Sequence, residues 1–192
     1  MLSEEYCVID IETAPIRFTD PEIVDYQIDK SFNRDFHPFF AKVVAAGLKQ
    51  AGKTAEVFCS DDEGSILTAF WRRLRELGPR KYVTFNGYQF DVPFLLIRSK
   101  FQRIRAEVEI NLNLWKMEDS NHFDCMQALS LRRTFPWVSL DITCRMLGVT
   151  LPRNRLAGKE IPDLYAKKSW KQIEAHNRQD LELTEALYLR VR

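Results

Sequence analysis

Two acidic residues in an otherwise apolar segment are the first candidates for chemistry. The segment is 6–12, Tyr-Cys-Val-Ile-Asp-Ile-Glu, and its β-branched, apolar residues predict a central strand. Because side chains alternate along a strand, Asp10 and Glu12 point to the same face. Two like charges side by side in a buried strand are costly and call for a counter-charge. The alternative is a strand that ends in solvent with both acids exposed, and the short Asp-Ile-Glu-Thr segment alone does not distinguish the two.

A third acid, Asp91, stands where a predicted strand gives way to a predicted helix. Residues 82–85 predict the strand, the turn Asn86-Gly87 ends it, and residues 91–101 predict the helix. A short acid suits a helix N-terminus, so capping is the alternative to a functional role for Asp91. Asn86 is placed either to orient a ligand or to make the turn.

The last helix carries a histidine and a fourth acid on its apolar side. His176 and Asp180 are four residues apart and therefore share a face. They interrupt the apolar stripe that includes Ile173, Leu181 and Leu187. Polar groups on a buried stripe need partners, and a private hydrogen bond between His176 and Asp180 is the simplest alternative to a functional site.

Taken together, the four carboxylates come from three elements that can meet at one edge of a sheet. Acids that converge repel one another unless cations neutralise them. Oxygen ligands of this kind suit Mg²⁺ or Mn²⁺ and not zinc. Two such ions about 4 Å apart form the clamp used for in-line displacement at phosphorus. The pattern therefore predicts a site for two Mg²⁺ or Mn²⁺ ions.

The elements that must position these acids predict an α/β fold with a mixed five-stranded sheet flanked by helices. The 192 residues, 45% of them hydrophobic, fit a single domain over 1–192. The predicted strands are 6–12, 42–49, 55–59, 82–85 and 122–124, and the predicted helices are 62–77, 91–101, about 125–131, 139–147 and the C-terminal one. Ser139 is expected to cap its helix, and Ser169 with Gln172 predicts a capping box for the last one. Residues 150–163 are predicted to form a loop, and 105–120 give no clear prediction.

Composition excludes several classes of protein. The four cysteines are far apart, without the spacing of a zinc site, and predict buried thiols. No apolar run reaches the roughly 18 residues that a membrane span needs, and residues 1–6 do not resemble a signal peptide, so we expect a cytoplasmic protein. A net charge of +1 argues against broad coating of nucleic acid. The basic clusters, Arg98–Arg105, Arg132-Arg133 and Arg153–Lys159, are either phosphate contacts or solvated faces.

Three segments resemble known motifs. Ile9-Asp10-Ile11-Glu12-Thr13, the run from Asn86 to Asp91, and His176 to Asp180 are similar to the three exonuclease motifs of the DEDD 3′–5′ exonuclease superfamily. Phe36-His37-Pro38, Phe123-Asp124 and Leu140-Asp141 resemble the bacterial and archaeal branch of predicted exonucleases related to the proofreading domain of family B DNA polymerases. The resemblance spans nearly the whole chain and implies a ribonuclease H-like fold.

The resemblance also implies roles for individual residues. Asp10, Glu12, Asp91 and Asp180 would be the metal ligands, with Asp10 shared by both ions, in a two-metal-ion hydrolysis of the terminal phosphodiester that releases nucleoside 5′-monophosphates. Thr13 and Asn86 are expected to hold the terminal nucleotide, with Phe90 packed beside it. Asp124 and Asp141 are expected to position helices, and His37 and His122 are expected to be structural.

One position departs from the pattern of the superfamily. Its tyrosine subgroup has Tyr four residues before the last Asp, and its histidine subgroup has His five residues before it. This chain has His176 four residues before Asp180, which is the first spacing with the second residue type. We expect His176 to orient or deprotonate the attacking water. His176→Tyr is then expected to alter the pH–rate profile, and an unchanged kcat in His176→Ala would contradict the role.

The predicted substrate is the 3′ end of single-stranded nucleic acid, DNA or RNA, with the polymerase resemblance favouring DNA. One alternative is a catalytically silent module that binds nucleic acid or a partner protein. Another is an endonuclease, which would cleave circular single strands. We expect no membrane partner, and a role in proofreading or repair calls for a polymerase, helicase or repair protein as partner.

Overall fold

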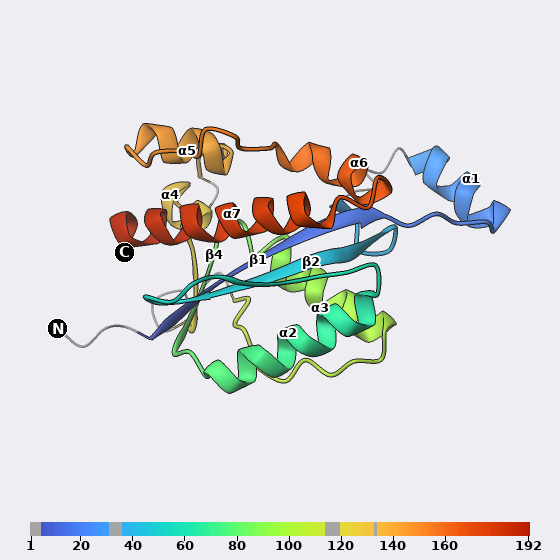
Figure 1. Ribbon diagram of the computed structural model, residues 1–192, viewed down its shortest axis with the longest axis horizontal. Helices are drawn as coiled ribbons and strands as arrows, with labels where there is room; N and C mark the ends of the chain where they lie inside the picture. The colour runs from blue at the N-terminus through green and yellow to red at the C-terminus, as the bar shows by residue number, and fades with distance from the viewer. Residues whose placement is uncertain (1–4, 31–35, 114–119, 133) are drawn as a thin grey trace.

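A mixed five-stranded sheet forms the centre of the molecule. The computed structural model describes residues 5–30, 36–113, 120–132 and 134–192 (Figure 1). The strands are β1 (Tyr6–Pro15), β2 (Ala41–Gln50), β3 (Glu56–Cys59), β4 (Lys81–Thr84) and β5 (His122–Asp124), in the spatial order β3-β2-β1-β4-β5. The β1–β2 and β2–β3 pairs are antiparallel, and the β1–β4 and β4–β5 pairs are parallel. The predicted sheet is confirmed.

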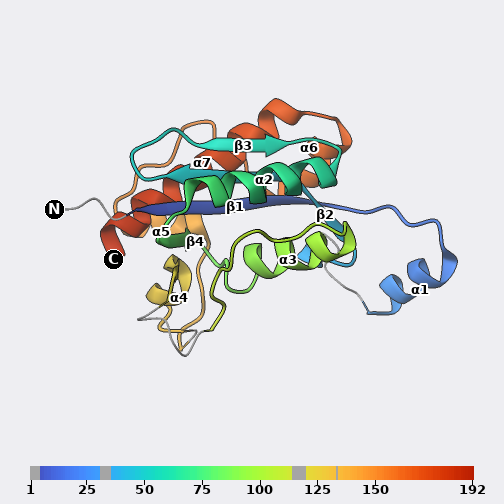
Figure 2. The same ribbon diagram turned by 90° about the horizontal axis from the view of Figure 1, so that it is seen from below.

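The helices cover the sheet on both faces. They are α1 (Pro21–Lys30), α2 (Glu63–Leu77), α3 (Asp91–Phe101), α4 (Cys125–Leu129), α5 (Leu140–Met146), α6 (Ile161–Ala166) and α7 (Trp170–Val191), with a 3₁₀ turn at Gly158–Glu160. Helix α7 runs along one face with α4, α5 and α6, whereas α2 and α3 lie on the other (Figure 1). The view from below shows α2 lying along the strands of the sheet, with α3 beside it (Figure 2).

Strand β1 is buried on both faces, as its composition predicts. Val8 packs with Leu181 and Leu187 of α7, whereas Ile9 and Ile11 belong to the core formed with α2 and α3. Because side chains alternate, Asp10 and Glu12 share the face of Val8 and lie beneath α7. Asp10 and Glu12 therefore both lie on the face of the sheet that α7 covers.

Helix α2 begins and ends where its sequence predicts. The Asp62 carboxylate accepts hydrogen bonds from the backbone N–H groups of Gly64 and Ser65, at 3.0 and 3.3 Å. Gly78, with φ of 52°, ends the helix in the left-handed conformation, and its N–H donates to the Leu74 carbonyl. Well-defined ends fix the register in which α2 packs on the sheet.

The loop predicted over 150–163 is wrong in its second half. Residues 158–160 form the 3₁₀ turn, and α6 starts at Ile161. Pro162 stands in the first turn of α6, where the missing N–H has no helical partner, so here proline marks a helix start. Ile161 and Leu164 pack with Ala14 and Ile173 in a small core of their own. Helix α1 lies in a region for which the sequence patterns give no prediction.

The predicted side-chain caps of α5 and α7 are also wrong. Ser169 precedes α7, but its side chain makes no capping hydrogen bond; its backbone carbonyl accepts from the N–H groups of Gln172 and Ile173. Ser139 precedes α5 and likewise contributes its backbone carbonyl, which accepts from Thr143. Both helices therefore start at the predicted positions without the predicted side-chain bonds.

Arg98 has a structural role that separates it from the rest of its basic run. Its guanidinium donates to both carboxylate oxygens of Glu63, from Nε at 2.9 Å and from Nη2 at 2.6 Å. Glu63 also accepts from the Val43 N–H and from Gln102 Nε2. This buried, hydrogen-bonded pair joins α2, α3 and the start of β2, so Arg98 is not a phosphate contact. Within the described part of the chain, no helix combines the length and apolarity needed to cross a membrane.

Candidate active site

Helix α7 approaches the sheet closely over Asp10 because the neighbouring strand carries a glycine there. Gly47 of β2 pairs with Asp10 of β1. A Cβ atom on Gly47 would lie 2.0 Å from Asn177 Oδ1 and 2.6 Å from Leu181 Cδ1. No side chain larger than hydrogen fits at this position without moving the helix. The glycine thus allows the polar face of α7 to meet the acids of β1.

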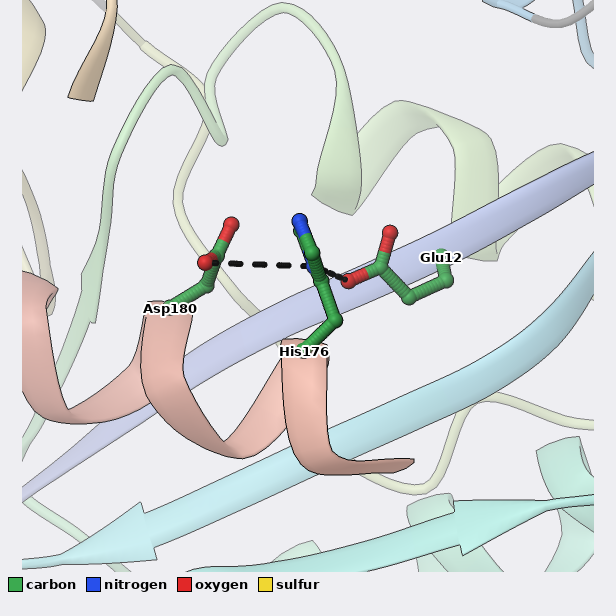
Figure 3. Close-up of side chains that lie close together, drawn as sticks. All are labelled: Glu12, His176 and Asp180. Carbon is green, nitrogen blue, oxygen red and sulfur yellow. Dashed lines mark hydrogen bonds and ion pairs between the residues drawn. The ribbon is translucent and has the colours of Figure 1, made fainter. Parts of the chain in front are cut away.

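Glu12, His176 and Asp180 form a tight group between β1 and α7 (Figure 3). One ligand atom from each lies within 4.8 Å of the others. His176 Nδ1 is 2.7 Å from Glu12 Oε1 and 3.9 Å from Asp180 Oδ1. The private His176–Asp180 hydrogen bond considered as an alternative is therefore wrong, since the imidazole bonds to Glu12. The other ring nitrogen, Nε2, is buried and has no hydrogen-bond partner among the described residues.

Asp10 is held by a residue that the sequence motifs do not single out. Asn177 Nδ2 donates to Asp10 Oδ2 at 2.7 Å, and the Asn177 side chain is fully buried. In the sequence, the feature that could have indicated Asn177 is that a second polar residue directly follows His176 on the inward side of the helix. A buried amide aimed at a carboxylate fixes which of its oxygens remains free for another ligand.

Asp91 joins the same pocket from α3. Its Oδ1 accepts a hydrogen bond from the Ile11 N–H at 3.1 Å, between the two acids of β1. Phe90 is the N-cap residue of α3, and no side-chain hydrogen bond caps this helix. Asp91 itself stands in the first turn of α3, so its carboxylate is placed at the helix N-terminus while it also bonds to β1. The side chain reaches across to β1 and is 3% exposed.

Burial and repulsion by neighbouring charges disfavour the charged forms of Asp10 and Asp91. Burial, followed by the charges of Asp180, Glu12 and Asp91, raises the pKa of Asp10 well above its usual range. Burial and the charges of Asp124 and Glu12 raise the pKa of Asp91 to about 8, although its backbone hydrogen bonds act in the opposite direction. Such shifts are typical of acids collected for a functional purpose.

The pKa values of Glu12 and His176 are linked through their hydrogen bond. Burial raises the pKa of Glu12, although the bond to His176 lowers it. Burial alone would lower the pKa of His176, but the hydrogen bond and charge of Glu12 and the charge of Asp180 raise it to about 9. The hydrogen bond to Glu12 thus favours the protonated imidazole of His176.

Arg155 supplies a second counter-charge from the loop between α5 and α6. Its Nη1 lies 2.6 Å from Asp180 Oδ1, and its Nε lies 2.6 Å from Asp141 Oδ1. The side chain is only 8% exposed. Sequence alone places Arg155 in a basic cluster and gives no signal that it pairs with Asp180, because an irregular loop has no periodicity from which to infer a direction.

The three residues expected to hold substrate are near the acids in the chain: Thr13 follows Glu12, Phe90 precedes Asp91, and Asn86 begins the turn before it. Thr13 is buried and follows a shift in register between Glu12 and Thr13 in the pairing of β1 with β2. Asn86 adopts a φ of 70°, and its Oδ1 is buried without a partner among the described residues. Phe90 is half-buried, and its ring lies 5.6 Å from that of Phe36 and 5.4 Å from that of Phe94.

Asp124 holds the turn before Asp91 and the start of α4 in place. Its Oδ1 accepts from the N–H groups of Asn86, Met126 and Gln127, and its Oδ2 accepts from the N–H of Tyr88. It therefore caps α4 and fixes the turn that leads to Asp91, in agreement with its predicted positioning role. Its own charge adds to the negative potential of the pocket.

The donor set of this pocket fits hard divalent cations. Its carboxylates come from β1, α3 and α7 and interact electrostatically, and among the described residues His176 and Arg155 oppose their charge. Mg²⁺ and Mn²⁺ prefer carboxylate oxygens and accept sites with few protein ligands. Asp10, Glu12, Asp91 and Asp180 are the residues that would hold them.

Comparisons with known proteins identify a family and related chains. The family model for a predicted 3′–5′ exonuclease related to the exonuclease domain of PolB matches residues 36–192. An uncharacterized protein of Methanocaldococcus jannaschii is 27% identical over 168 residues, which cover 79% of this chain and 86% of that protein. The catalytic chain of DNA polymerase epsilon from Kluyveromyces lactis is 28% identical over 152 residues, which cover 69% of this chain.

A solved structure shares the fold. The family B DNA polymerase from the hyperthermophilic archaeon Pyrobaculum calidifontis superposes with a TM-score of 0.67 at 20% identity over 96% of this chain. The expected ribonuclease H-like fold is thereby confirmed. The chain spans only 24% of that polymerase, and its match covers 6% of the Kluyveromyces lactis protein.

Proposed function

The chain belongs to the family of predicted 3′–5′ exonucleases related to the exonuclease domain of PolB, and from this membership we propose that it hydrolyses the 3′-terminal phosphodiester of single-stranded nucleic acid. DNA is the proposed substrate, and nucleoside 5′-monophosphates are the products. One observation carries the proposal: the charges of Asp10, Glu12, Asp91 and Asp180 interact, and Glu12 and Asp180 lie in one tight group with His176. A protein that only bound a polyanion would gain nothing from acids facing phosphates.

The proposed cofactor is a pair of Mg²⁺ or Mn²⁺ ions held by these four carboxylates. When bound, such a pair supplies the positive charge that favours in-line displacement at phosphorus. Asp10 is the proposed shared ligand on the basis of the motif resemblance, and Asn177 engages one of its oxygens and orients the carboxylate. Asp91 is oriented in the same way by the Ile11 N–H.

His176 is proposed to position Glu12 and the attacking water. Nδ1 is engaged by Glu12, so Nε2 is the atom left to contact a water or the substrate. The ring stands between Glu12 and Asp180 with its second nitrogen pointing away from α7 (Figure 3). His176→Ala is expected to lower kcat, and a kcat equal to that of the wild type at every pH would contradict the role.

Thr13, Asn86 and Phe90 are proposed to hold the terminal nucleotide. The support is local: Asn86 offers a buried Oδ1 with no partner among the described residues, and Phe90 offers a half-buried ring next to Asp91 in the chain. An amide and an aromatic face are suited to a nucleotide sugar and base.

The decisive experiment uses DNA and RNA oligomers labelled at the 5′ end, each incubated with protein in Mg²⁺, Mn²⁺ or EDTA. We expect a ladder that shortens from the 3′ end, only with metal, and none with Asp10→Asn or Asp180→Asn. A circular single strand serves as the control that should remain intact, since its cleavage would indicate an endonuclease. Failure to shorten any linear strand, together with no metal binding by calorimetry, would favour the silent binding module.

We also propose that the protein is cytoplasmic. We propose that its partner is a polymerase, a helicase or a repair protein. Affinity capture with the catalytically inactive Asp180→Asn protein, compared with the wild type, tests the partner.

A further inference from the structure

Apolar side chains are exposed over α4, α5 and the segment between them. We call this surface the α4–α5 patch, and its exposed members include Leu129, Phe135, Trp137, Val138, Met146 and Leu147. Phe135 is 58% exposed and Trp137 is 60% exposed. Trp137, Val138, Met146 and Leu147 border a cavity of about 180 Å³. A contiguous apolar surface of this kind marks a binding site more often than an isolated exposed residue does.

The charge around the patch has one sign. Arg132, Arg145 and Arg153 are exposed, and within the described ranges none of the three pairs with an acid. Over residues 125–159 the sequence contains a single acid, Asp141, and it is bound to Arg155. Arg145 and Arg153 border an open groove that follows α5. Aromatic rings beside unpaired basic groups match single-stranded nucleic acid, which presents base faces and phosphates together.

The α4–α5 patch adjoins the proposed active site. Phe85 lines its cavity, and the next residue is Asn86. On the other side, Asp141 of α5 connects through Arg155 to Asp180. Helices α4 and α5 lie on the same side of the sheet as α7 (Figure 1). A strand whose 3′ end enters the pocket can therefore continue directly over the patch.

We propose that the α4–α5 patch binds the nucleotides that precede the 3′-terminal one, with Trp137 and Phe135 stacking on bases and Arg132, Arg145 and Arg153 contacting phosphates. This inference rests on the proposed function of the neighbouring pocket. Stacking on aromatic faces tolerates any base, so the patch binds strands without sequence preference. Affinity then increases with strand length until the patch is filled, and it decreases as salt is raised.

The test compares short and long substrates. For 5′-labelled DNA of about 20 nucleotides, Trp137→Ala is expected to raise KM on the order of tenfold while kcat stays the same, the effect of one lost base stack. For a trinucleotide, which ends before the patch, the same substitution leaves KM unchanged. Trp137→Phe keeps an aromatic face and restores most of the affinity. Phe101→Ala removes a similarly exposed ring, 52% exposed, at the far end of α3 and is the matched control.

A second measurement separates this inference from the proposed function. Fluorescence anisotropy of the labelled 20-mer in EDTA reports binding without cleavage, so it remains informative if the protein cuts nothing. Weaker binding by Trp137→Ala, and by the double variant Arg145→Gln/Arg153→Gln, supports the patch. Binding equal to that of the wild type overturns it. A wild-type dimer that Met146→Glu dissociates, with oligonucleotide binding unchanged, overturns it in favour of an interface between copies of this chain.

Discussion

Arg155 and Asp180 form an ion pair at the centre of the candidate active site, with Nη1 2.6 Å from Oδ1. The arginine comes from an irregular loop and the acid from α7, yet the guanidinium is almost completely enclosed. It stands beside a carboxylate proposed to bind metal, and it is anchored on its other side by Asp141. The metal-free pocket thus carries its own cation.

This pairing predicts that Arg155 and metal compete for Asp180. In Arg155→Gln the carboxylate loses its counter-charge, so the metal-free protein should lose about 3 kcal/mol of unfolding free energy, the usual order when one partner of a buried pair is removed. Mn²⁺ should then bind more tightly and raise the Tm by more than in the wild type. Thermal unfolding with and without Mn²⁺ measures both effects.

Arg153→Gln is the control for this experiment, since Arg153 is exposed and pairs with no acid in the described part of the chain. Equal Mn²⁺ affinity in Arg155→Gln and the wild type would show that the two cations do not compete.

The crowding of acids predicts a variant that is more stable and inactive. Asp91→Asn replaces a carboxyl group whose charged form is disfavoured in the fold, where its pKa is raised to about 8, and keeps an oxygen that can accept from the Ile11 N–H. At pH 7 the folded protein holds a proton on Asp91 that the unfolded chain releases, so the acid destabilises the fold and a neutral amide does not. Without metal, the unfolding free energy should rise by at least about 1 kcal/mol, which for this size of chain is a Tm increase of at least about 2 °C. The increase in Tm on adding Mg²⁺ should shrink, and 3′ shortening should stop.

Calorimetric scans at pH 7 in EDTA measure this change. A Tm below that of the wild type would mean that the Asp91 charge does not destabilise the metal-free fold. Asp163→Asn, which changes an exposed acid of α6, is the control for the loss of one negative charge.

Asn177 is predicted to control metal affinity through Asp10. Asn177→Ala removes the donor to Asp10 Oδ2, and the loss of such an orienting partner typically costs about 10–100-fold in metal affinity or activity. The fold should tolerate the change, because alanine relieves the tight approach to Gly47. Mn²⁺ titration by calorimetry and the rate of 3′ shortening are the measurements.

Gln172→Ala changes an exposed amide on the same helix and should leave both quantities unaltered. A normal Mn²⁺ affinity in Asn177→Ala would mean that Asp10 keeps its orientation without the amide.

The five strands and the gathering of the acids could be predicted from sequence because both depend on regular periods. The two-residue period of β1 places Asp10 and Glu12 on one face, and the four-residue spacing of α7 does the same for His176 and Asp180. The role of Asn177 could not be predicted, because its contact depends on how closely α7 approaches the sheet, which Gly47 decides from another strand.

The remaining differences come from segments without a period. Arg155 lies in an irregular stretch, so its direction is set by Asp141 and Asp180, which are distant in the chain. Pro162 is compatible with a loop by its residue type, yet it stands in the first turn of α6, where proline is equally well accommodated. In such segments, contacts with residues distant in the chain determine the local structure.

The buried His122 is predicted to make the stability of the fold sensitive to acid. Its Nδ1 donates to the Asn111 carbonyl and its Nε2 lies 2.8 Å from Thr84 Oγ1, beneath the stacked ring of Tyr88. Burial, opposed by the bond to Asn111, lowers its pKa to about 4. Between about pH 6.5 and 4 the unfolded chain therefore binds a proton that the folded protein does not, and stability falls as the pH is lowered.

The full effect of His122 should reach about 3 kcal/mol at the lower pH, and it should be absent above about pH 6.5. His122→Gln keeps an amide near Thr84 but does not titrate, so its unfolding free energy should depend less steeply on pH across this window. Urea unfolding in EDTA at several pH values measures how steeply the unfolding free energy depends on pH in the wild type and in His122→Gln. The acids of the active site contribute equally to this dependence in both proteins. Identical slopes for His122→Gln and the wild type would show that His122 is protonated as readily in the folded protein as in the unfolded chain.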